Sequence, residues 1–332
     1  KSYVNLLKAI KRCDLNIPKK INKVVFEKPF GTDKETAKQI EEENNNTFYP
    51  ENSFIMDHYL GKEIMRNILF LKFTNPFFDG VLNNKFVDNI EFILDEDLGV
   101  ANRLDYYNET GALRDIIQNH LLQAIALILM DIPENLTQEE IKKKKIEILN
   151  CITAMPAENH LFGQYQSYAS EAKNFSFNNT EIETFAKIVF KCETKKWKGV
   201  NLHVRTGKKL ERKYAQIVIN FKKPLHRLEI GDINFNKIII QIQPKEGMNI
   251  HMNSKRYGEA NAVENVSLSF FNENSIYPNP SDGHRRLLGD IILGNKTFFP
   301  TFEEIHKSWE IIEEIDKMRK DKYILPAVDH VK

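Results

Sequence analysis

The spacing of apolar residues changes along the chain, and this change predicts two kinds of architecture. Up to about residue 184 the apolar positions mostly follow a helical period, which predicts helices at 2–11, 60–71, 113–130 and 139–154. Two compact apolar runs, 21–26 and 89–94, predict buried strands. After residue 184 alternation predicts strands at 184–192, 200–206, 215–221, 237–243 and 266–270, and closing helices at 283–292 and 301–319.

The order of these elements predicts an α+β fold with an α/β remnant at its front. Helix, strand, turn and helix follow one another in residues 2–46, as in a piece of an open α/β sheet. Thr32 is expected to cap the second helix, with Glu35 completing a capping box. The later strands have short connections, which favours a large, mostly antiparallel sheet. The Asn-rich stretches 172–180 and 272–281 are expected to be surface loops.

Composition and charge exclude several classes of protein. The hydrophobic fraction of 42% is normal for a globular protein with a full core. Lys plus Arg number 47 and Asp plus Glu 46, so the chain lacks the basic excess typical of nucleic-acid binding. The three cysteines are scattered, as in reduced cytosolic proteins. The longest apolar stretch, 121–130, is far shorter than the roughly 20 residues of a membrane span.

The first candidate site is the segment 57–63, with the sequence D-H-Y-L-G-K-E. On a helix, His58 and Lys62 would share a face because they are four residues apart. Two such donors suit a phosphate dianion. The alternative is an ordinary helix start in which Asp57 is the N-cap.

The second candidate is His120, which lies in the apolar helix expected at 113–130. A lone histidine there is more often a structural residue at the edge of the core. A carboxylate such as Asp57, bound to one imidazole nitrogen, would leave the other nitrogen free to accept a proton.

The third candidate is the basic turn R-T-G-K-K-L at 205–210, which continues to Lys213. A strand that ends in a glycine turn with several cations can bind an anion. A solvated basic turn is the alternative.

The nine histidines have no metal-ligand spacing, so no metal site is expected. The sequence also contains no G-x-G-x-x-G, Walker or G-x-S-x-G motif.

In this order, the motifs resemble those of glucose-6-phosphate dehydrogenases. The resemblance rests on E-K-P-F-G at 27–31, D-H-Y-L-G-K-E at 57–63, G-A-L-R-D-x-x-Q-N-H-L-L-Q at 111–123, R-T-G-K at 205–208 and Q-P at 243–244. The segment 286–294 with Phe298, Phe299 and Trp309 adds to it, so that the similarity covers nearly the whole chain.

The resemblance implies oxidation of glucose 6-phosphate to 6-phosphogluconolactone with NADP as cofactor, the first step of the pentose phosphate pathway. It makes His120 the general base and Asp57 the carboxylate that orients it. The residues implied in substrate binding are Lys28, His58, Tyr59, Lys62, Glu96, Asp115, Lys208, Lys213 and Gln243. Lys28 is also implied in cofactor binding, and its peptide bond to Pro29 is expected to be cis.

The resemblance also sets expectations for domains and assembly. Residues 1–55 are expected to be a remnant of a Rossmann-type NADP-binding domain, and residues 56–332 the substrate-binding α+β domain. A glycine-rich phosphate loop is expected at the front of this family, and nothing like it is found here, so the chain alone is expected to bind sugar phosphate without turning it over. A cytoplasmic homodimer or homotetramer is implied, without nucleic-acid or membrane partners. The competing hypothesis is a non-catalytic sugar-phosphate-binding or oligomerisation module.

Overall fold

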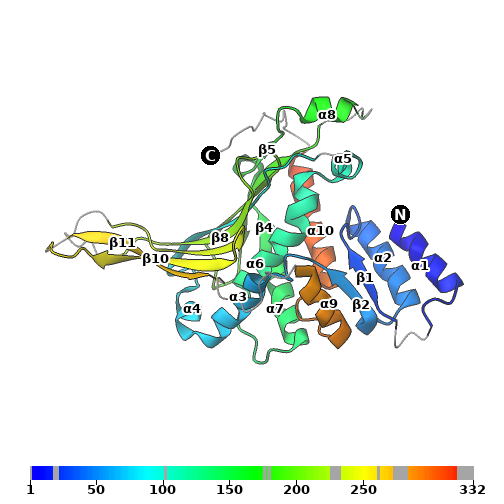
Figure 1. The fold of residues 1–332 in the computed structure, drawn as a ribbon, viewed down its shortest axis with the longest axis horizontal. Helices are drawn as coiled ribbons and strands as arrows, with labels where there is room; N and C mark the ends of the chain where they lie inside the picture. The colour runs from blue at the N-terminus through cyan, green and yellow to red at the C-terminus, as the bar shows by residue number, and fades with distance from the viewer. Residues whose placement is uncertain are drawn as a thin grey trace.

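The computed structural model has a small parallel sheet with two helices at one end and a large sheet with helices on its inner face (Figure 1). It describes residues 2–17, 22–100, 103–174, 177, 181–224, 233–259, 262–271 and 283–319. This arrangement confirms the α+β class with an α/β piece at the front.

The front of the chain forms the two-stranded parallel sheet. Strands β1 (Val24–Glu27) and β2 (Ser53–Met56) pair in parallel with Val24 opposite Ser53. Helix α1 (Ser2–Arg12) packs beside α2 (Lys34–Thr47), and α2 connects the two strands. Parallel pairing brings both carboxyl ends to the same edge, where ligands bind in open α/β sheets.

The second sheet has nine strands, and most of its pairs are antiparallel. Its order is β11-β10-β9-β8-β3-β7-β6-β4, with β5 also paired to β6. The central strands β3 (Val87–Asp95) and β7 (Asn201–Gly207) form its parallel pair, so their carboxyl ends meet at one edge. The other strands are β4 (Ile152–Ala154), β5 (Leu161–Gly163), β6 (Phe185–Cys192), β8 (Tyr214–Phe221), β9 (Lys237–Gln243), β10 (Gly247–Lys255) and β11 (Val263–Phe271).

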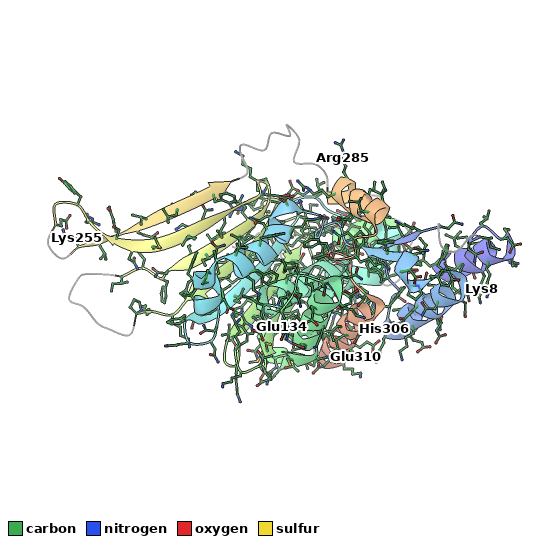
Figure 2. All side chains as sticks on the ribbon, turned by 90° about the horizontal axis from the view of Figure 1, so that it is seen from below. Lys8, Glu134, Lys255, Arg285, His306 and Glu310 are labelled. Atoms are coloured by element: carbon green, nitrogen blue, oxygen red, sulfur yellow. The ribbon has the colours of Figure 1, made fainter. Side chains whose placement is uncertain are left out.

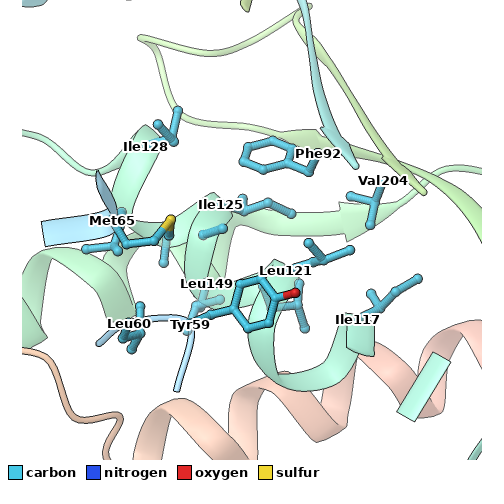
Figure 3. Close-up of a cluster of buried hydrophobic side chains, with 14 of the residues drawn as sticks. Tyr59, Leu60, Met65, Phe92, Ile117, Leu121, Ile125, Ile128, Leu149 and Val204 are labelled. Carbon is cyan, nitrogen blue, oxygen red and sulfur yellow. The ribbon is translucent and has the colours of Figure 1, made fainter. Parts of the chain in front are cut away.

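Most helices of this part pack on one face of the sheet and form the main core with it, whereas α5 and α8 form a smaller cluster of their own around Tyr107 and Tyr168. Their bounds are α3 (Glu63–Thr74), α4 (Pro76–Val81), α5 (Leu104–Ala112), α6 (Leu122–Leu129), α7 (Gln138–Cys151), α8 (Tyr168–Asn174), α9 (Gly283–Leu293) and α10 (Phe302–Arg319). Between α5 and α6 lies the π-helical segment η3 (Leu113–Leu121), which packs against β3 and β7. In Figure 3, Phe92 and Val204 of the sheet face Ile117, Leu121 and Ile125.

The outer strands leave the helical layer. In Figure 1 the β10–β11 hairpin extends far to the left of the helices, and Figure 2 marks its tip by Lys255. Side chains of β10 beyond Met248 are all at least partly exposed, whereas the central strands β3 and β7 have buried side chains along their length. This end of the sheet therefore offers a broad surface outside the core.

Several expected elements differ from those observed. Helix α2 is capped by Asp33, not Thr32, and Thr36 completes the capping box. The helix expected at 60–71 begins at Glu63. The single helix expected at 113–130 contains the π-helical segment. The helix expected at 139–154 ends at Cys151, and the last three residues of that range form β4. Strands β2, β5 and β10 were not predicted either, and α8 extends to Asn174 inside the loop expected at 172–180. The loop expected at 272–281 lies outside the described residues.

Candidate active site

The candidate residues meet where the carboxyl ends of the two parallel strand pairs, β1–β2 and β3–β7, face the π-helical segment. Lys28 follows β1, and Asp57 follows β2. Glu96 and Lys208 come just after the adjacent parallel strands β3 and β7. His120 lies on η3. The parallel pairing in each sheet therefore directs residues from distant parts of the sequence to one place.

His120 and Asp57 form a buried hydrogen-bonded pair. The Nδ1 atom of His120 lies 2.6 Å from Asp57 Oδ1. Both side chains are almost fully buried, with relative exposures of 3% and 2%. Asp57 Oδ1 also accepts the backbone N–H of Tyr59 at 2.9 Å. The carboxylate is thus fixed from a second direction and directs the other ring nitrogen of His120 toward Lys28.

The environment separates the protonation states of these two groups. Burial alone would raise the pKa of Asp57, but His120, His58 and the Tyr59 backbone N–H together lower this pKa to about 2. Burial lowers the pKa of His120, and the Lys28 ammonium lowers it further, while Asp57 raises it. At neutral pH the pair therefore consists of a carboxylate and a neutral imidazole, whose Nε2 can accept a proton.

Lys28 connects the end of β1 to the π-helical segment. Its Nζ donates to Asp115 Oδ1 at 3.0 Å and to the Asp115 carbonyl oxygen at 3.1 Å, and lies 3.3 Å from His120 Nε2. The Lys28–Pro29 peptide bond is cis, which confirms the prediction, and Gln243–Pro244 is a second cis bond. Lys28 thus lies at the end of β1 beside Nε2 of His120, the nitrogen that can accept a proton.

Asp115, Lys208 and Glu96 extend this network to the central sheet. The buried Lys208 ammonium pairs with Glu96 and lies 3.6 Å from Asp115 Oδ2. The backbone N–H of Glu96 donates to the Gly207 carbonyl at 2.9 Å, so the two strand ends are fixed together. Although burial raises the pKa of Asp115, Lys28 and Lys208 lower it overall. The three acidic and basic groups offer both donors and acceptors to a polyhydroxyl ligand.

The segment 57–62 is a series of turns, so the helical spacing expected for His58 and Lys62 is wrong. The backbone N–H of Leu60 bonds to Asp57 O, and that of Lys62 bonds to Tyr59 O. The Lys62 ammonium lies 5.7 Å from the Tyr59 ring centroid. The Tyr59 hydroxyl donates to Gln243 Oε1 at a long 3.5 Å. The Tyr59 ring thus lies near both His58 and Lys62, with 5.0 Å between the His58 and Tyr59 ring centroids.

Lys213 differs from the other candidates. It is exposed, just before β8, at the far end of the 207–213 turn from Lys208. Of the hydrogen bonds and ion pairs found among the described residues, none joins Lys213 to the other candidates. Its place in the site stays a prediction.

Two buried residues that the sequence did not single out cap the helical unit that carries His120. Glu183 Oε1 accepts the backbone N–H of Leu113 at 3.0 Å, and Arg319 pairs with the same carboxylate. At the other end, Lys72 Nζ donates to the carbonyl oxygens of Leu127, Ile128 and Met130. Burial lowers the pKa of Lys72 to about 7. These partners come from distant segments, so no local sequence signal marks them.

Within the described part of the chain, Asp57, His58 and His120 are grouped closely enough to hold a metal ion. Two features argue against such a use. His120 Nδ1 is already bound to Asp57, and His120 Nε2 faces the Lys28 ammonium at 3.3 Å. A divalent cation would meet this positive charge, so the expectation of a site without metal stays a prediction.

Comparison with known proteins decides the family. Residues 69–328 match the model for the C-terminal domain of glucose-6-phosphate dehydrogenase. Residues 1–67 match the model for the NAD binding domain of the same family. The chain belongs to the glucose-6-phosphate dehydrogenase family. The match at the front supports a dinucleotide cofactor and does not support the expectation that part of the coenzyme domain is missing.

Curated glucose-6-phosphate dehydrogenases resemble the chain over most of its length. The enzyme of Borreliella burgdorferi is 32% identical over 94% of this chain and 68% of its own length. Glucose-6-phosphate 1-dehydrogenase 2 of Mycobacterium bovis is 34% identical over 88% of this chain and 60% of its own length. The chain thus spans between 60% and 68% of the full length of these two relatives.

Solved structures of the family share the fold. A glucose-6-phosphate dehydrogenase in complex with its substrate glucose-6-phosphate has a TM-score of 0.88, at 27% identity, over 98% of this chain and 69% of the other. The Mycobacterium avium enzyme has a TM-score of 0.83 at 23% identity.

Among the residues that the structure describes, no helix has the length and apolarity needed to cross a membrane.

Proposed function

We propose that this member of the glucose-6-phosphate dehydrogenase family oxidises the C1 hydroxyl of glucose 6-phosphate to 6-phosphogluconolactone, with NADP as hydride acceptor. The observation that carries the proposal is the buried Asp57–His120 pair, in which the second imidazole nitrogen faces the Lys28 ammonium at the end of β1. A positioned neutral base of this kind suits removal of a hydroxyl proton.

In the proposed reaction, His120 Nε2 accepts the proton of the C1 hydroxyl. Asp57 holds Nδ1–H, which fixes the tautomer and stabilises the imidazolium that forms. Lys28 has the opposite effect on His120, because its ammonium disfavours a second positive charge 3.3 Å away. The lowered pKa keeps His120 unprotonated at neutral pH, ready to act as the base.

Bound NADP would supply the redox chemistry by accepting hydride from C1. The chain fits one part of such a site, since the carboxyl ends of β1 and β2 meet beside Lys28 and residues 1–67 match the NAD binding domain model. Lys28 is the residue of this chain that we assign to both cofactor and sugar. The sequence contains no glycine-rich phosphate turn, so we assign no residue to the pyrophosphate.

The substrate residues divide into two groups by chemistry. His58, Tyr59 and Lys62 lie in the 57–62 turn and are assigned to the 6-phosphate. Gln243, which accepts from the Tyr59 hydroxyl, is assigned to the substrate pocket. The residues assigned to the sugar are Glu96, Asp115, Lys208 and Lys213. The first three already form one charged network, in which sugar hydroxyls can replace some of the internal contacts.

Domain organisation and assembly are part of the same proposal. We assign residues 1–55 to the coenzyme domain and residues 56–332 to the substrate domain. A homodimer or homotetramer formed through the large sheet agrees with the exposed apolar side chains on its outer strands, such as Leu268 and Phe270. We assign the protein to the cytoplasm, as the family resemblance implies. Sedimentation equilibrium of the purified protein would measure this assembly.

The deciding experiment is a steady-state assay of the protein expressed from its complete reading frame. Absorbance of the reduced cofactor, NADPH or NADH, is followed with glucose 6-phosphate or glucose as substrate, and with NADP or NAD as acceptor. We expect turnover of glucose 6-phosphate with NADP that is lost in His120→Asn. Absence of turnover with either acceptor, in a protein that still binds glucose 6-phosphate by calorimetry, would favour a non-catalytic sugar-phosphate-binding module.

A further inference from the structure

The first turn of α9 is locked against the 57–62 turn by two glycines. A side chain on Gly61 would overlap the backbone of Gly283, and one on Gly283 would overlap the His58 carbonyl. The two backbones can approach this closely only because neither position has a Cβ. In Figure 2 Arg285, two residues after this contact, lies at the top of the view on α9. The approach fixes residue 284 beside the candidate phosphate site.

This contact places a third imidazole in line with the two already described. The His284 ring stacks on His58 with 5.6 Å between centroids and 6° between planes. His58 in turn meets His120 edge-on at 4.5 Å. His120 is buried, whereas the His284 side chain is 41% exposed. The three rings therefore run from the proposed base to the rim of the site.

The charged groups around His58 indicate that an anion would be stabilised beside this row of rings. Burial, His120, Lys28 and His284 all lower the pKa of His58, to about 3, while Asp57 acts in the opposite direction. Asp57 is already engaged with His120, and Glu27 lies on the outer side, with Oε1 3.7 Å from His284 Nε2. An anion at the edges of the stacked His58 and His284 rings would accept their N–H donors and would stabilise the protonated form of His58.

We propose that His284 is a further binding residue for the phosphate group of the sugar phosphate, acting from α9 alongside His58 and Lys62. The assignment rests on the proposed function, because the probe is the 6-phosphate of the proposed substrate. His284 donates a ring N–H to a phosphate oxygen at the rim and contributes nothing to the chemistry at C1. Its loss therefore changes substrate binding and leaves the chemical step in place.

The test compares His284→Ala and His284→Glu with the parent enzyme. Loss of a hydrogen bond to a charged group should raise KM for glucose 6-phosphate about tenfold, with little change in kcat. His284→Glu should raise this KM further, because it sets a second negative charge against the phosphate. KM for unphosphorylated glucose should stay unchanged in both variants. Inorganic phosphate, as a competitive inhibitor, should lose affinity in the same order.

His306→Gln is the matched control, since His306 is also paired with a glutamate but lies on α10 (Figure 2). Lys62→Ala separates this inference from the proposed function. If Lys62→Ala weakens glucose 6-phosphate selectively and both His284 variants bind it normally, His284 only pairs with Glu27 and the inference is wrong. If the parent protein does not discriminate between glucose 6-phosphate and glucose, the proposed function itself fails.

Discussion

Asp57 Oδ1 lies 2.6 Å from His120 Nδ1, although 63 residues separate them, and both side chains are shielded from water. Such a pair is costly to bury unless each partner satisfies the other. Asp57 follows β2, whereas His120 lies on the π-helical segment, so the pair also fixes the small sheet against the helical layer. The hydrogen bond that positions the proposed base thus also connects the small sheet to the helical layer.

Replacement of His120 tests the proposed base directly. His120→Asn keeps a polar side chain but removes the proton acceptor that faces Lys28. We expect kcat to fall at least ~10²-fold, the lower range for loss of a general base, with a smaller change in KM. Steady-state kinetics measures both values. His203→Asn, on β7, serves as control. A His120 variant with nearly normal kcat would exclude this residue as the base.

Asp57→Asn should change both the rate and its pH dependence. Asp57 raises the pKa of His120 and hydrogen-bonds to its Nδ1, so removal of the carboxylate lowers that pKa further. The acid limb of the kcat/KM profile, which reports His120 protonation, should therefore move to lower pH. The maximal kcat should fall, because the imidazolium that forms loses its counter-charge. A limb that moves to higher pH, or stays in place, would contradict this account of the pair.

Lys62→Ala tests the assignment of the 57–62 turn to phosphate. The Lys62 ammonium lies 5.7 Å from the Tyr59 ring centroid. Its loss should raise KM for glucose 6-phosphate by about tenfold or more, and should change KM for glucose much less. Lys198→Ala, on the exposed loop before β7, is a suitable control. An equal effect on both substrates would show that Lys62 does not bind the phosphate.

The strands were predictable where burial alternates along them. In β9 the residues Ile238, Ile240 and Ile242 are buried and their neighbours are not, which is the pattern that predicted the strand. Strand β10 was missed because it lies in the hairpin beyond the helical layer, where few of its side chains are buried. Main-chain pairing with β9 and β11 holds it instead, and side-chain pattern does not report such pairing.

The motifs singled out the candidate residues as a set, but not their geometry. His120 and Asp115 were both named as candidates, whereas their common orientation depends on the π-helical segment. Residues five apart do not share a face of an α-helix, yet Lys28 Nζ reaches both His120 and Asp115. The wider i→i+5 turn, seen in the bond from Leu122 N–H to Ile117 O, brings them to one side. Apolar periodicity alone gave an ordinary helix here.

Gly111 stands where this helical unit begins, and its replacement tests whether the geometry depends on the buried cap. Its φ of 64° is disfavoured for residues with a Cβ, and a side chain there would overlap the Glu183 carboxylate. That carboxylate accepts the Leu113 N–H and pairs with Arg319, so it has little freedom to move. Gly111→Ala should lower the free energy of unfolding by about 1–3 kcal/mol. Urea denaturation followed by circular dichroism measures the change.

The matched control is Gly289→Ala, in the interior of α9, where an added Cβ meets no atom within 4 Å. Alanine should stabilise that helix by about 0.5–1 kcal/mol, because it restricts the unfolded chain without a clash. The two substitutions are chemically identical, so their opposite signs would separate the effect of the Glu183 cap from the general effect of glycine. Equal stability changes would mean that Glu183 moves aside and that the start of the His120 helix is not fixed by it. With the cap in place, Gly111→Ala should also lower kcat, because a shifted helix start displaces His120 from Lys28.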